Sequence, residues 1–178
     1  MLTQIISNKD EKIVDGFIIP AKRHINADGT FVLVPENTQI ANDVYINPSC
    51  QITGTGVVIE YGVCISGDNI KIPGWWVLLG STTEVSGNDV TIRNWVKMPY
   101  GTKVVGDNVV LGDNISHVII ANAQINSHVE VHGGSVICEK AEIGEYSVIK
   151  PNCIIPPNTI IPSHSIVERS EVNLHYEK

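Results

Sequence analysis

Residues 119–167 divide into blocks of six and read IIANAQ INSHVE VHGGSV ICEKAE IGEYSV IKPNCI IPPNTI IPSHSI V. An apolar residue heads every block, and the heads are Ile119, Ile125, Val131, Ile137, Ile143, Ile149, Ile155, Ile161 and Val167. A small or medium residue stands four places after each of the first eight heads, and these are Ala123, Val129, Ser135, Ala141, Ser147, Cys153, Thr159 and Ser165. A period of six fits neither the alternation of a strand nor the period of an α-helix. It fits a short strand followed by a corner, repeated along the chain.

Three such units close one triangular coil of roughly eighteen residues, and stacked coils pair edge to edge about 4.8 Å apart. The head residue and the small residue are expected to point into the shaft. Pro151-Asn152, Pro157-Asn158 and Pro162 fall at the corners. Proline and asparagine suit turns there, whereas proline does not suit a buried central strand. The sequence therefore predicts an all-β fold, a single-stranded parallel β-helix of about seven coils.

The segment AEIGEYSVIKPNCIIPPNTIIP, residues 141–162, resembles the left-handed β-helix of the hexapeptide-repeat transferase superfamily. That superfamily includes acyl-CoA-dependent acyltransferases, γ-class carbonic anhydrases and non-catalytic members such as the small β-helical dynactin subunits. The resemblance implies a left-handed shaft and favours a homotrimer. It does not select an activity, because one fold carries many functions.

The rest of the chain follows this pattern less strictly. Residues 1–33 are not hexads, and the Asp28-Gly29 turn predicts a β-hairpin that caps the N-terminal end of the shaft. The six-residue period begins at residue 34 and has the heads Val34, Ile40, Ile46, Ile52 and Val58. The β-helix is therefore expected over residues 34–168, with irregular coils over 59–118, regular coils over 119–168 and a polar tail over 169–178.

A glycine-containing motif recurs about every twenty residues in the irregular part, at Ser66-Gly67-Asp68-Asn69, Ser86-Gly87-Asn88-Asp89 and Val105-Gly106-Asp107-Asn108. We interpret it as a corner turn in coils that are one or two residues longer than eighteen, with glycine supplying positive φ angles. The register slips by two between Leu111 and Ile119, so a small loop is expected there.

Composition limits the function. The chain has 178 residues, a formal net charge of −7 and 17% charged residues. The negative charge argues against a nucleic-acid partner. No apolar run suits a signal peptide or a membrane span, so we expect a cytoplasmic protein without membrane association. The cysteines show no C-x-x-C pairing, and we expect reduced thiols and no metal site; they are Cys50, Cys64, Cys138 and Cys153.

The last place of each block should face outward. Five of these eight residues are apolar, namely Val136, Val148, Ile154, Ile160 and Ile166. Apolar residues gathered on a surface usually mark an interface, so a homo-oligomer is predicted. The alternative is that they pack under the tail or the N-terminal cap.

An acyltransferase of the resembling family uses a histidine as general base and binds its cofactor in the groove between two subunits. Histidine suits this role because it titrates near neutral pH. We select His117, which lies in the register slip, and His132, which follows an inward head, as candidate catalytic residues. Trp75, Trp95 and Tyr100 are candidate cofactor-binding residues, since aromatic faces bind flat apolar groups. The alternative is that these aromatic residues cover the flank of the shaft or fill a subunit interface.

A carbonic anhydrase would need three histidines on one zinc ion. That family spaces its close histidine pair five residues apart, whereas His128 and His132 are four apart. His128 and His164 would lie roughly 9–10 Å apart, two coils away from each other. Two function classes therefore stay open. The first is the transfer of an acyl group from CoA to a small acceptor or sugar. Acyl-CoA would then be a cosubstrate, and no covalently bound cofactor is expected. The second is a non-catalytic trimeric scaffold that binds a protein or a glycan.

Overall fold

The computed structural model describes residues 11–14, 17–112 and 116–168, and for residues 11–14 and 17–19 it describes the backbone. The predicted polar tail and part of the register slip lie outside the described residues. All regular elements are β-strands, and three parallel seven-stranded sheets form the shaft. The described residues include no helix that could span a membrane. The predicted all-β parallel β-helix of about seven coils is thus confirmed, and its left-handedness stays a prediction.

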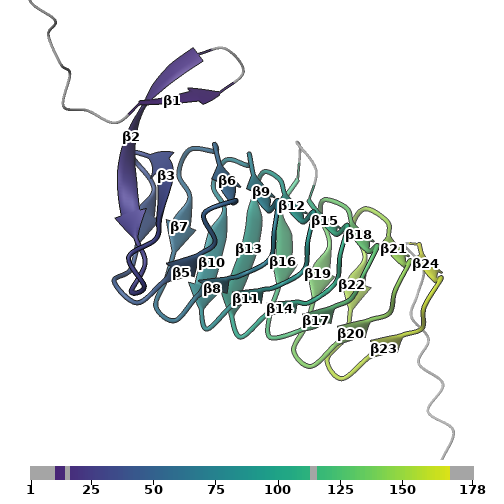
Figure 1. The fold of residues 1–178 in the computed structure, drawn as a ribbon. Helices are drawn as coiled ribbons and strands as arrows, with labels where there is room; N and C mark the ends of the chain where they lie inside the picture. The colour runs from purple at the N-terminus through teal and green to yellow at the C-terminus, as the bar shows by residue number, and fades with distance from the viewer. Residues whose placement is uncertain (1–10, 15–16, 113–115, 169–178) are drawn as a thin grey trace, which may run out of the picture.

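Each coil contributes one strand to each sheet, and we call the sheets faces 1, 2 and 3 (Figure 1). Face 1 contains β4 (Gln39–Ile40), β7 (Val58–Ile59), β10 (Leu78–Ser81), β13 (Val96–Tyr100), β16 (Val118–Ile120), β19 (Val136–Ile137) and β22 (Ile154–Ile155). Face 2 contains β5 (Tyr45–Ile46), β8 (Cys64–Ile65), β11 (Glu84–Val85), β14 (Lys103–Val104), β17 (Gln124–Ile125), β20 (Glu142–Ile143) and β23 (Ile160–Ile161). Face 3 contains β6 (Gln51–Ile52), β9 (Lys71–Ile72), β12 (Thr91–Ile92), β15 (Val110–Leu111), β18 (Glu130–Val131), β21 (Val148–Ile149) and β24 (Ile166–Val167).

The core is a column of inward aliphatic side chains inside the three faces. Along face 2 the column consists of Ile46, Ile65, Val85, Val104, Ile125 and Ile143, all fully buried. Most of the small residues predicted to point inward, among them Ser135, Ser147, Cys50 and Cys153, are also buried, whereas Thr159 and Ser165 of the last coil are half-buried. Burying each branched aliphatic side chain stabilises the fold by roughly 1.5–3 kcal/mol. The inward position of each six-residue unit therefore favours an apolar residue.

Two of the predicted heads do not point inward. Val58 and Ile119 are only half-buried, whereas their neighbours Val57, Ile59, Val118 and Ile120 are fully buried. The cause is the length of the coils, because Ile119 pairs with Lys97, which lies 22 positions earlier, whereas Ile154 pairs with Val136 across 18. The extra residues fall at corners. The strands therefore stay aligned from coil to coil, but the inward residues no longer recur at intervals of six.

The corners place residues with positive φ angles in three columns, one at each edge of the prism. Between faces 2 and 3 the column consists of Asn69, Asp89, Asn108, His128, Tyr146 and His164, with φ between 55° and 63°. The recurring glycine motif forms the first half of this column, but the positive φ falls on asparagine or aspartate. Gly67 and Gly87 serve a different purpose, because a Cβ atom on either would collide with the backbone of the next coil.

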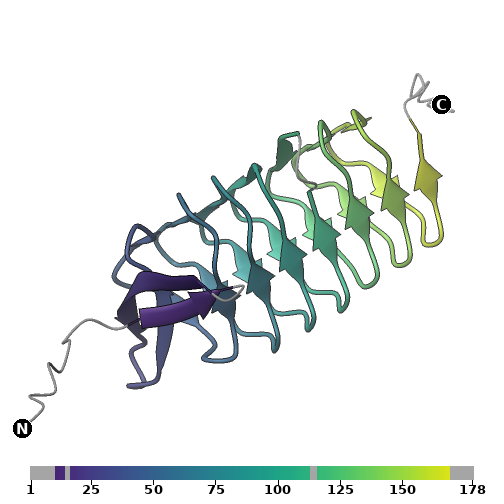
Figure 2. The same ribbon diagram turned by 90° about the horizontal axis from the view of Figure 1, so that it is seen from above.

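An antiparallel hairpin occupies the N-terminal end of the shaft (Figure 2). β1 (Glu11–Val14) pairs with β2 (Phe17–Ile25), and β2 pairs with β3 (Phe31–Pro35) across a turn closed by the Gly29 N–H and the Asn26 carbonyl, 3.0 Å apart. Asp28 Oδ1 accepts the Thr30 hydroxyl at 2.6 Å and the Thr30 N–H at 2.9 Å. These two bonds lower the pKa of the Asp28 carboxyl. The function of residues 1–33 as a cap stays a prediction.

The five outward apolar residues of the regular coils are spread over the prism. Val136 and Ile154 lie on face 1, Val148 and Ile166 on face 3, and Ile160 on face 2. Face 1 alone continues this apolar character toward the N-terminus, through Val58, Leu78 and Ile119. Face 1 is therefore the best candidate surface for the predicted interface, although the exposed Lys97 lies between Leu78 and Ile119.

Candidate functional site

The corner between faces 3 and 1 carries two tryptophans in an unusual backbone conformation. Trp76 and Trp95 have φ angles of 57° and 60°, in the column that also contains Gly56, Gly134 and Asn152. A left-handed conformation costs a residue with a side chain roughly 1–2 kcal/mol. Glycine or asparagine would avoid most of this cost, so the two indole rings occupy this corner against the local backbone preference.

The indole rings of Trp76 and Trp95 stack on each other, and the Trp95 ring contacts the tilted ring of His117. The Trp76 and Trp95 ring centroids are 6.1 Å apart with an interplanar angle of 7°, and the Trp95 and His117 centroids are 4.9 Å apart with an angle of 50°. The backbone fixes this arrangement, because the Trp95 N–H donates to the Trp75 carbonyl at 2.8 Å. The Trp75 N–H donates in turn to Asn94 Oδ1 at 2.9 Å. The hydrogen-bonded stacking of successive coils therefore brings these rings together.

A groove of about 200 Å³ opens beside this stack on face 1, and we call it the tryptophan groove. Its lining residues are Gly56, Val58, Trp76, Val77, Leu78, Trp95, Lys97 and His117. Gly56 lies against the Trp76 ring, since a Cβ atom at this position would be 3.6 Å from Trp76 Cδ2. Glycine therefore leaves room for the groove where a larger side chain would fill it.

The groove combines three kinds of chemistry. Val58, Leu78 and the indole rings offer an apolar surface for a flat or extended group. Lys97, which is exposed, supplies a positive charge at the border of the groove. His117 is also exposed and supplies ring nitrogens that can donate or accept a hydrogen bond. An apolar surface with a few convergent polar groups is the usual composition of a small-molecule site.

Of the five predicted site residues, Trp95 and His117 line the tryptophan groove. Trp75, Trp95 and His117 belong to this corner, and His132 lies just before it on face 3, in the next coil. The Gly134 N–H donates to the His117 carbonyl at 2.7 Å, which joins the two histidine-bearing segments. His132 Nε2 lies 3.3 Å from Glu130 Oε2, so Glu130 is the carboxylate that orients this imidazole.

Tyr100 does not belong to this corner. It ends β13, whereas Trp95 precedes the first residue of that strand, so the two are separated by roughly 16 Å of strand. The Tyr100 hydroxyl donates to the Glu139 carboxylate. This hydrogen bond raises the pKa of the Tyr100 phenol. Tyr100 therefore stabilises the opposite edge of face 1 and does not contribute to the tryptophan groove.

The candidate residues chosen from the sequence did not include Trp76, Lys97, Val58 or Leu78, which also line the groove. The signal for Lys97 was present, because it alternates with the inward residues Val96 and Met98 and so faces outward. Val58 could not be found, since the six-residue count predicted it to point inward.

A second ring column stands at the corner between faces 2 and 3. The Tyr146 ring stacks on His128 with centroids 4.4 Å apart and on His164 with centroids 5.0 Å apart, at interplanar angles of 10° and 1°. The three residues lie at one corner in successive coils, so His128 and His164 are two coils apart, as predicted. The described residues bring no group of three histidine, cysteine, aspartate or glutamate side chains together as a metal site.

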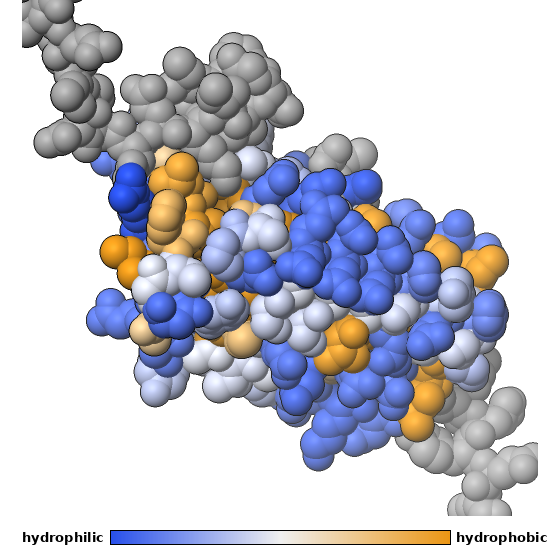
Figure 3. Space-filling view, viewed as in Figure 1, coloured by the Kyte–Doolittle hydropathy of each residue, from blue (hydrophilic) through white to orange (hydrophobic). Residues whose placement is uncertain are grey.

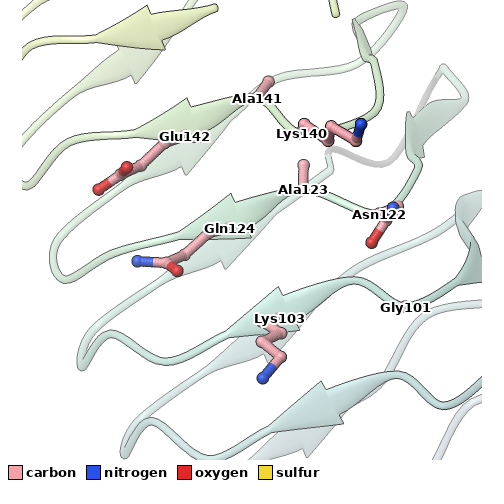
Figure 4. Close-up of a pocket in the computed structure, with 8 residues that line it drawn as sticks. All are labelled: Gly101, Lys103, Asn122, Ala123, Gln124, Lys140, Ala141 and Glu142. Carbon is pink, nitrogen blue, oxygen red and sulfur yellow. The ribbon is translucent and has the colours of Figure 1, made fainter. Parts of the chain in front are cut away.

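A polar hollow of about 260 Å³ lies where face 2 meets face 1 (Figure 4). Gly101, Ala123 and Ala141 leave the space, and Lys103, Gln124 and Glu142 project from successive strands beside it. Two of these polar groups already have partners beside the hollow, because Lys103 Nζ lies 3.4 Å from Glu84 Oε2 and Gln124 donates to Asn126 Oδ1 at 3.0 Å. The tryptophan groove is thus the better candidate site.

The class that the fold defines is the parallel β-solenoid built from six-residue units, as the resemblance to the hexapeptide-repeat superfamily implies. No family model matches the chain, and neither does any curated protein. Among solved structures, the chain is similar to a "putative acetyltransferase" from Bacillus cereus, with 20% identity and a TM-score of 0.56, over 74% of this chain and 78% of that one.

A second solved structure is a point mutant of perosamine N-acetyltransferase from Caulobacter crescentus in complex with CoA and GDP-perosamine. It matches with 16% identity and a TM-score of 0.48, over 72% of this chain and 51% of that one. At these identities the likeness to the Bacillus cereus protein shows the fold alone, and the second match is too distant in shape to support an argument.

Proposed function

We propose that the protein is an acyltransferase that moves an acyl group from CoA to a small acceptor or sugar, with the tryptophan groove as its site and His117 as general base. The observation that carries the proposal is the contact between Trp95 and His117 at the border of the groove. It places a proton acceptor beside an aromatic surface. The same groove presents the Lys97 cation, which suits an anionic cosubstrate.

The chemistry assigned to His117 is proton transfer. A neutral imidazole nitrogen accepts the proton of an acceptor hydroxyl or amine while that oxygen or nitrogen attacks the thioester carbonyl. The C–S bond then breaks, and the leaving thiolate of CoA takes the proton from His117. An acylated acceptor and free CoA result, and the histidine returns to its neutral form.

The size of the groove bears on the oligomer. Sites for drug-sized ligands usually measure about 300–1,000 Å³. The tryptophan groove has about 200 Å³, so it would hold one part of acyl-CoA. The groove opens on face 1, which carries the outward apolar residues Val58, Leu78, Ile119, Val136 and Ile154 on either side of Lys97. We therefore propose that a neighbouring copy packs on face 1 in a homotrimer and encloses the rest of the ligand.

Ligand-dependent thermal unfolding tests this function. A ligand at one hundred times its dissociation constant adds about 2.7 kcal/mol of stability, which corresponds to roughly 5–10 °C for a chain of this size. Millimolar CoA and acetyl-CoA are expected to raise the midpoint, and Trp95→Ala should abolish the rise. Tyr61→Ala is the matched control, because Tyr61 is an exposed aromatic residue on another corner. An unchanged midpoint at all CoA concentrations would favour the scaffold function instead.

His132 is the second candidate base, because Glu130 orients its ring. An acetyl-transfer assay with a panel of amino sugars and sugars, in which the release of the CoA thiol is measured, distinguishes His117 from His132. His117→Gln should abolish turnover while the CoA-induced stabilisation remains, and His164→Gln should leave both unchanged. Loss of turnover in His132→Gln alone would assign the base to His132.

A further inference from the structure

A second groove lies on face 1 beside the tryptophan groove, and we call it the Tyr61 groove. It measures about 440 Å³, and its lining residues are Gln39, Ile40, Ala41, Val58, Ile59, Glu60, Tyr61 and Ser81. Val58 lines both grooves, so the two hollows adjoin. The volume falls within the range of about 300–1,000 Å³ that small-molecule sites usually have. The proposed acyl transfer gives this groove no role.

Part of the lining of the Tyr61 groove is aliphatic. Ile40 and Ala41 of the first coil are half-buried and pack against the core. The outward Val58 side chain of the second coil is half-buried beside them, where β4 pairs with β7. In the surface that Figure 3 shows, apolar side chains gather at the N-terminal end of the shaft, whereas polar side chains cover its middle. An aliphatic chain that lies on such a surface is removed from water, which favours binding.

A fixed carboxylate borders this aliphatic surface. Glu60 is half-buried, and its Oε2 accepts both the Ser81 N–H and the Ser81 hydroxyl at 3.1 Å. These two bonds from the next coil hold the carboxylate in place. Both end on Oε2, so Oε1 can accept a further hydrogen bond from a ligand. Because the acceptor is already positioned, little side-chain freedom is lost when a donor binds to it.

A second carboxylate and an exposed ring lie next to Glu60. Asp43 Oδ2 would be 3.9 Å from a Cβ atom at Gly62, the residue that follows Tyr61. The Tyr61 side chain is 68% exposed. The lining residues of this groove, all of them described in the structure, include no lysine, arginine or histidine. The tryptophan groove contains Lys97, so the two adjoining grooves differ in the sign of their charge.

This combination of groups suits an organic cation. An ammonium group has three hydrogen-bond donors and no acceptor. Carboxylates form charge-assisted hydrogen bonds with it, and the face of a tyrosine ring attracts it as well. An anionic ligand would be repelled by Glu60 and Asp43. A purely apolar ligand would cover the Glu60 carboxylate without donating a hydrogen bond to it, which is costly.

Glu60 is distant from the candidate base. One row of paired outward residues crosses face 1 through Val58, Leu78, Lys97 and Ile119. Glu60 follows this row by two residues, whereas His117 precedes it by two residues and lies three coils further along the shaft. At about 3.3 Å per residue and 4.8 Å per coil, their Cα atoms are roughly 20 Å apart. An ammonium group at Glu60 is therefore not the nitrogen that His117 would deprotonate, and a site there does not depend on the proposed function.

We propose that the Tyr61 groove binds the ammonium group of an aliphatic amine. The Glu60 carboxylate accepts its hydrogen bond, the Tyr61 ring contacts the cation, and Asp43 adds a second negative charge. The aliphatic chain of the amine lies along Ile40, Ala41 and Val58.

Titration of the whole chain with hexylammonium chloride, without CoA, tests the proposal by amide NMR. Saturable binding with a dissociation constant on the order of 1 mM is expected for a ligand of this size. The Ser81 amide signal should move, because the Ser81 N–H donates to the carboxylate that receives the ammonium group. 1-Hexanol has the same chain without the charge, and hexanoate has the opposite charge. Neither should show saturable binding at the same concentrations.

Three variants locate the site. Glu60→Gln keeps the shape of the side chain and removes its charge, so it should weaken hexylammonium binding about tenfold. Tyr61→Ala should weaken it about two- to fivefold, as expected for a cation–π contact at an exposed position. Glu145→Gln is the matched control, because it removes the same charge from an exposed residue at the corner between faces 2 and 3, and it should leave the affinity unchanged. Far-UV circular dichroism checks that each variant keeps its β structure.

The proposal is wrong if a folded Glu60→Gln variant binds hexylammonium as tightly as the wild type, or if 1-hexanol binds equally well. It is also wrong if binding leaves the Ser81 amide signal in place. Light scattering covers the remaining alternative. If Tyr61→Ala lowers the mass of the particle and leaves hexylammonium binding unchanged, Tyr61 is a contact between copies and not part of an amine site.

Discussion

Gly87→Ala should destabilise the protein far more than an ordinary glycine substitution. A Cβ atom at Gly87 would lie well inside contact distance of the Gly106 carbonyl oxygen in the next coil. The coils would have to separate at this corner. Several hydrogen bonds join the coils there, among them the bond from the Ser86 N–H to the Val104 carbonyl at 2.9 Å and the bond from the Asn88 N–H to Asp107 Oδ1 at 2.7 Å. Breaking a hydrogen bond and burying an unpaired group costs about 1–3 kcal/mol, so we expect a loss of about 3 kcal/mol.

Urea unfolding followed by circular dichroism measures this loss. Gly29→Ala is the control, because a Cβ atom at Gly29 meets nothing within 4 Å and only the φ angle of 85° opposes it. A left-handed alanine costs roughly 1–2 kcal/mol. The Gly87 variant should therefore unfold at a lower urea concentration than the Gly29 variant. If the two midpoints coincide, close packing of the coils at this corner is not what makes glycine necessary.

Two other predictions concern the core and one hydrogen bond. Ile143→Ala, at a fully buried position, should lower the free energy of unfolding by about 2–5 kcal/mol. Ile160→Ala, at a 69% exposed position, should lower it by less than about 0.5 kcal/mol. Comparable losses of the two variants in urea unfolding would contradict the described burial. The Glu139 hydrogen bond raises the pKa of Tyr100. Its contribution to stability is therefore complete below the pKa of an unfolded tyrosine and is lost as pH rises through the folded-state value. Ultraviolet titration should show a late-ionising phenol that Tyr100→Phe removes and Glu139→Gln shifts to lower pH; an unshifted titration in Glu139→Gln would rule out this bond as the cause.

The regular coils could be predicted from the sequence because one apolar residue per six marks the inward position without ambiguity. The prediction failed at Val58 and Ile119 for a physical reason. Each lies between two other aliphatic residues, in Val57-Val58-Ile59 and in Val118-Ile119-Ile120, so hydrophobicity does not show which residue points inward. Only the pairing of each strand with the coils on either side decides it.

The candidate site was predicted less well than the fold. Trp75, Trp95 and His117 share a corner because coils of unequal length still stack at the same edge, and the recurrence at twenty residues gave a hint of this. Tyr100 was grouped with them because it is close in sequence, although a complete strand separates it from Trp95.

The clustering of the tryptophans has a consequence for optical experiments. All three tryptophans of the chain, Trp75, Trp76 and Trp95, lie at one corner of two neighbouring coils, whereas the stacked Tyr146 belongs to a coil near the C-terminal end. Indole emission therefore reports the melting of the N-terminal half of the shaft and is blind to fraying of the last coils. Repeat proteins unfold with nearest-neighbour cooperativity, so their ends can open first. Tryptophan emission recorded together with far-UV circular dichroism, which reports all the strands, would show whether the N-terminal half of the shaft melts with the rest.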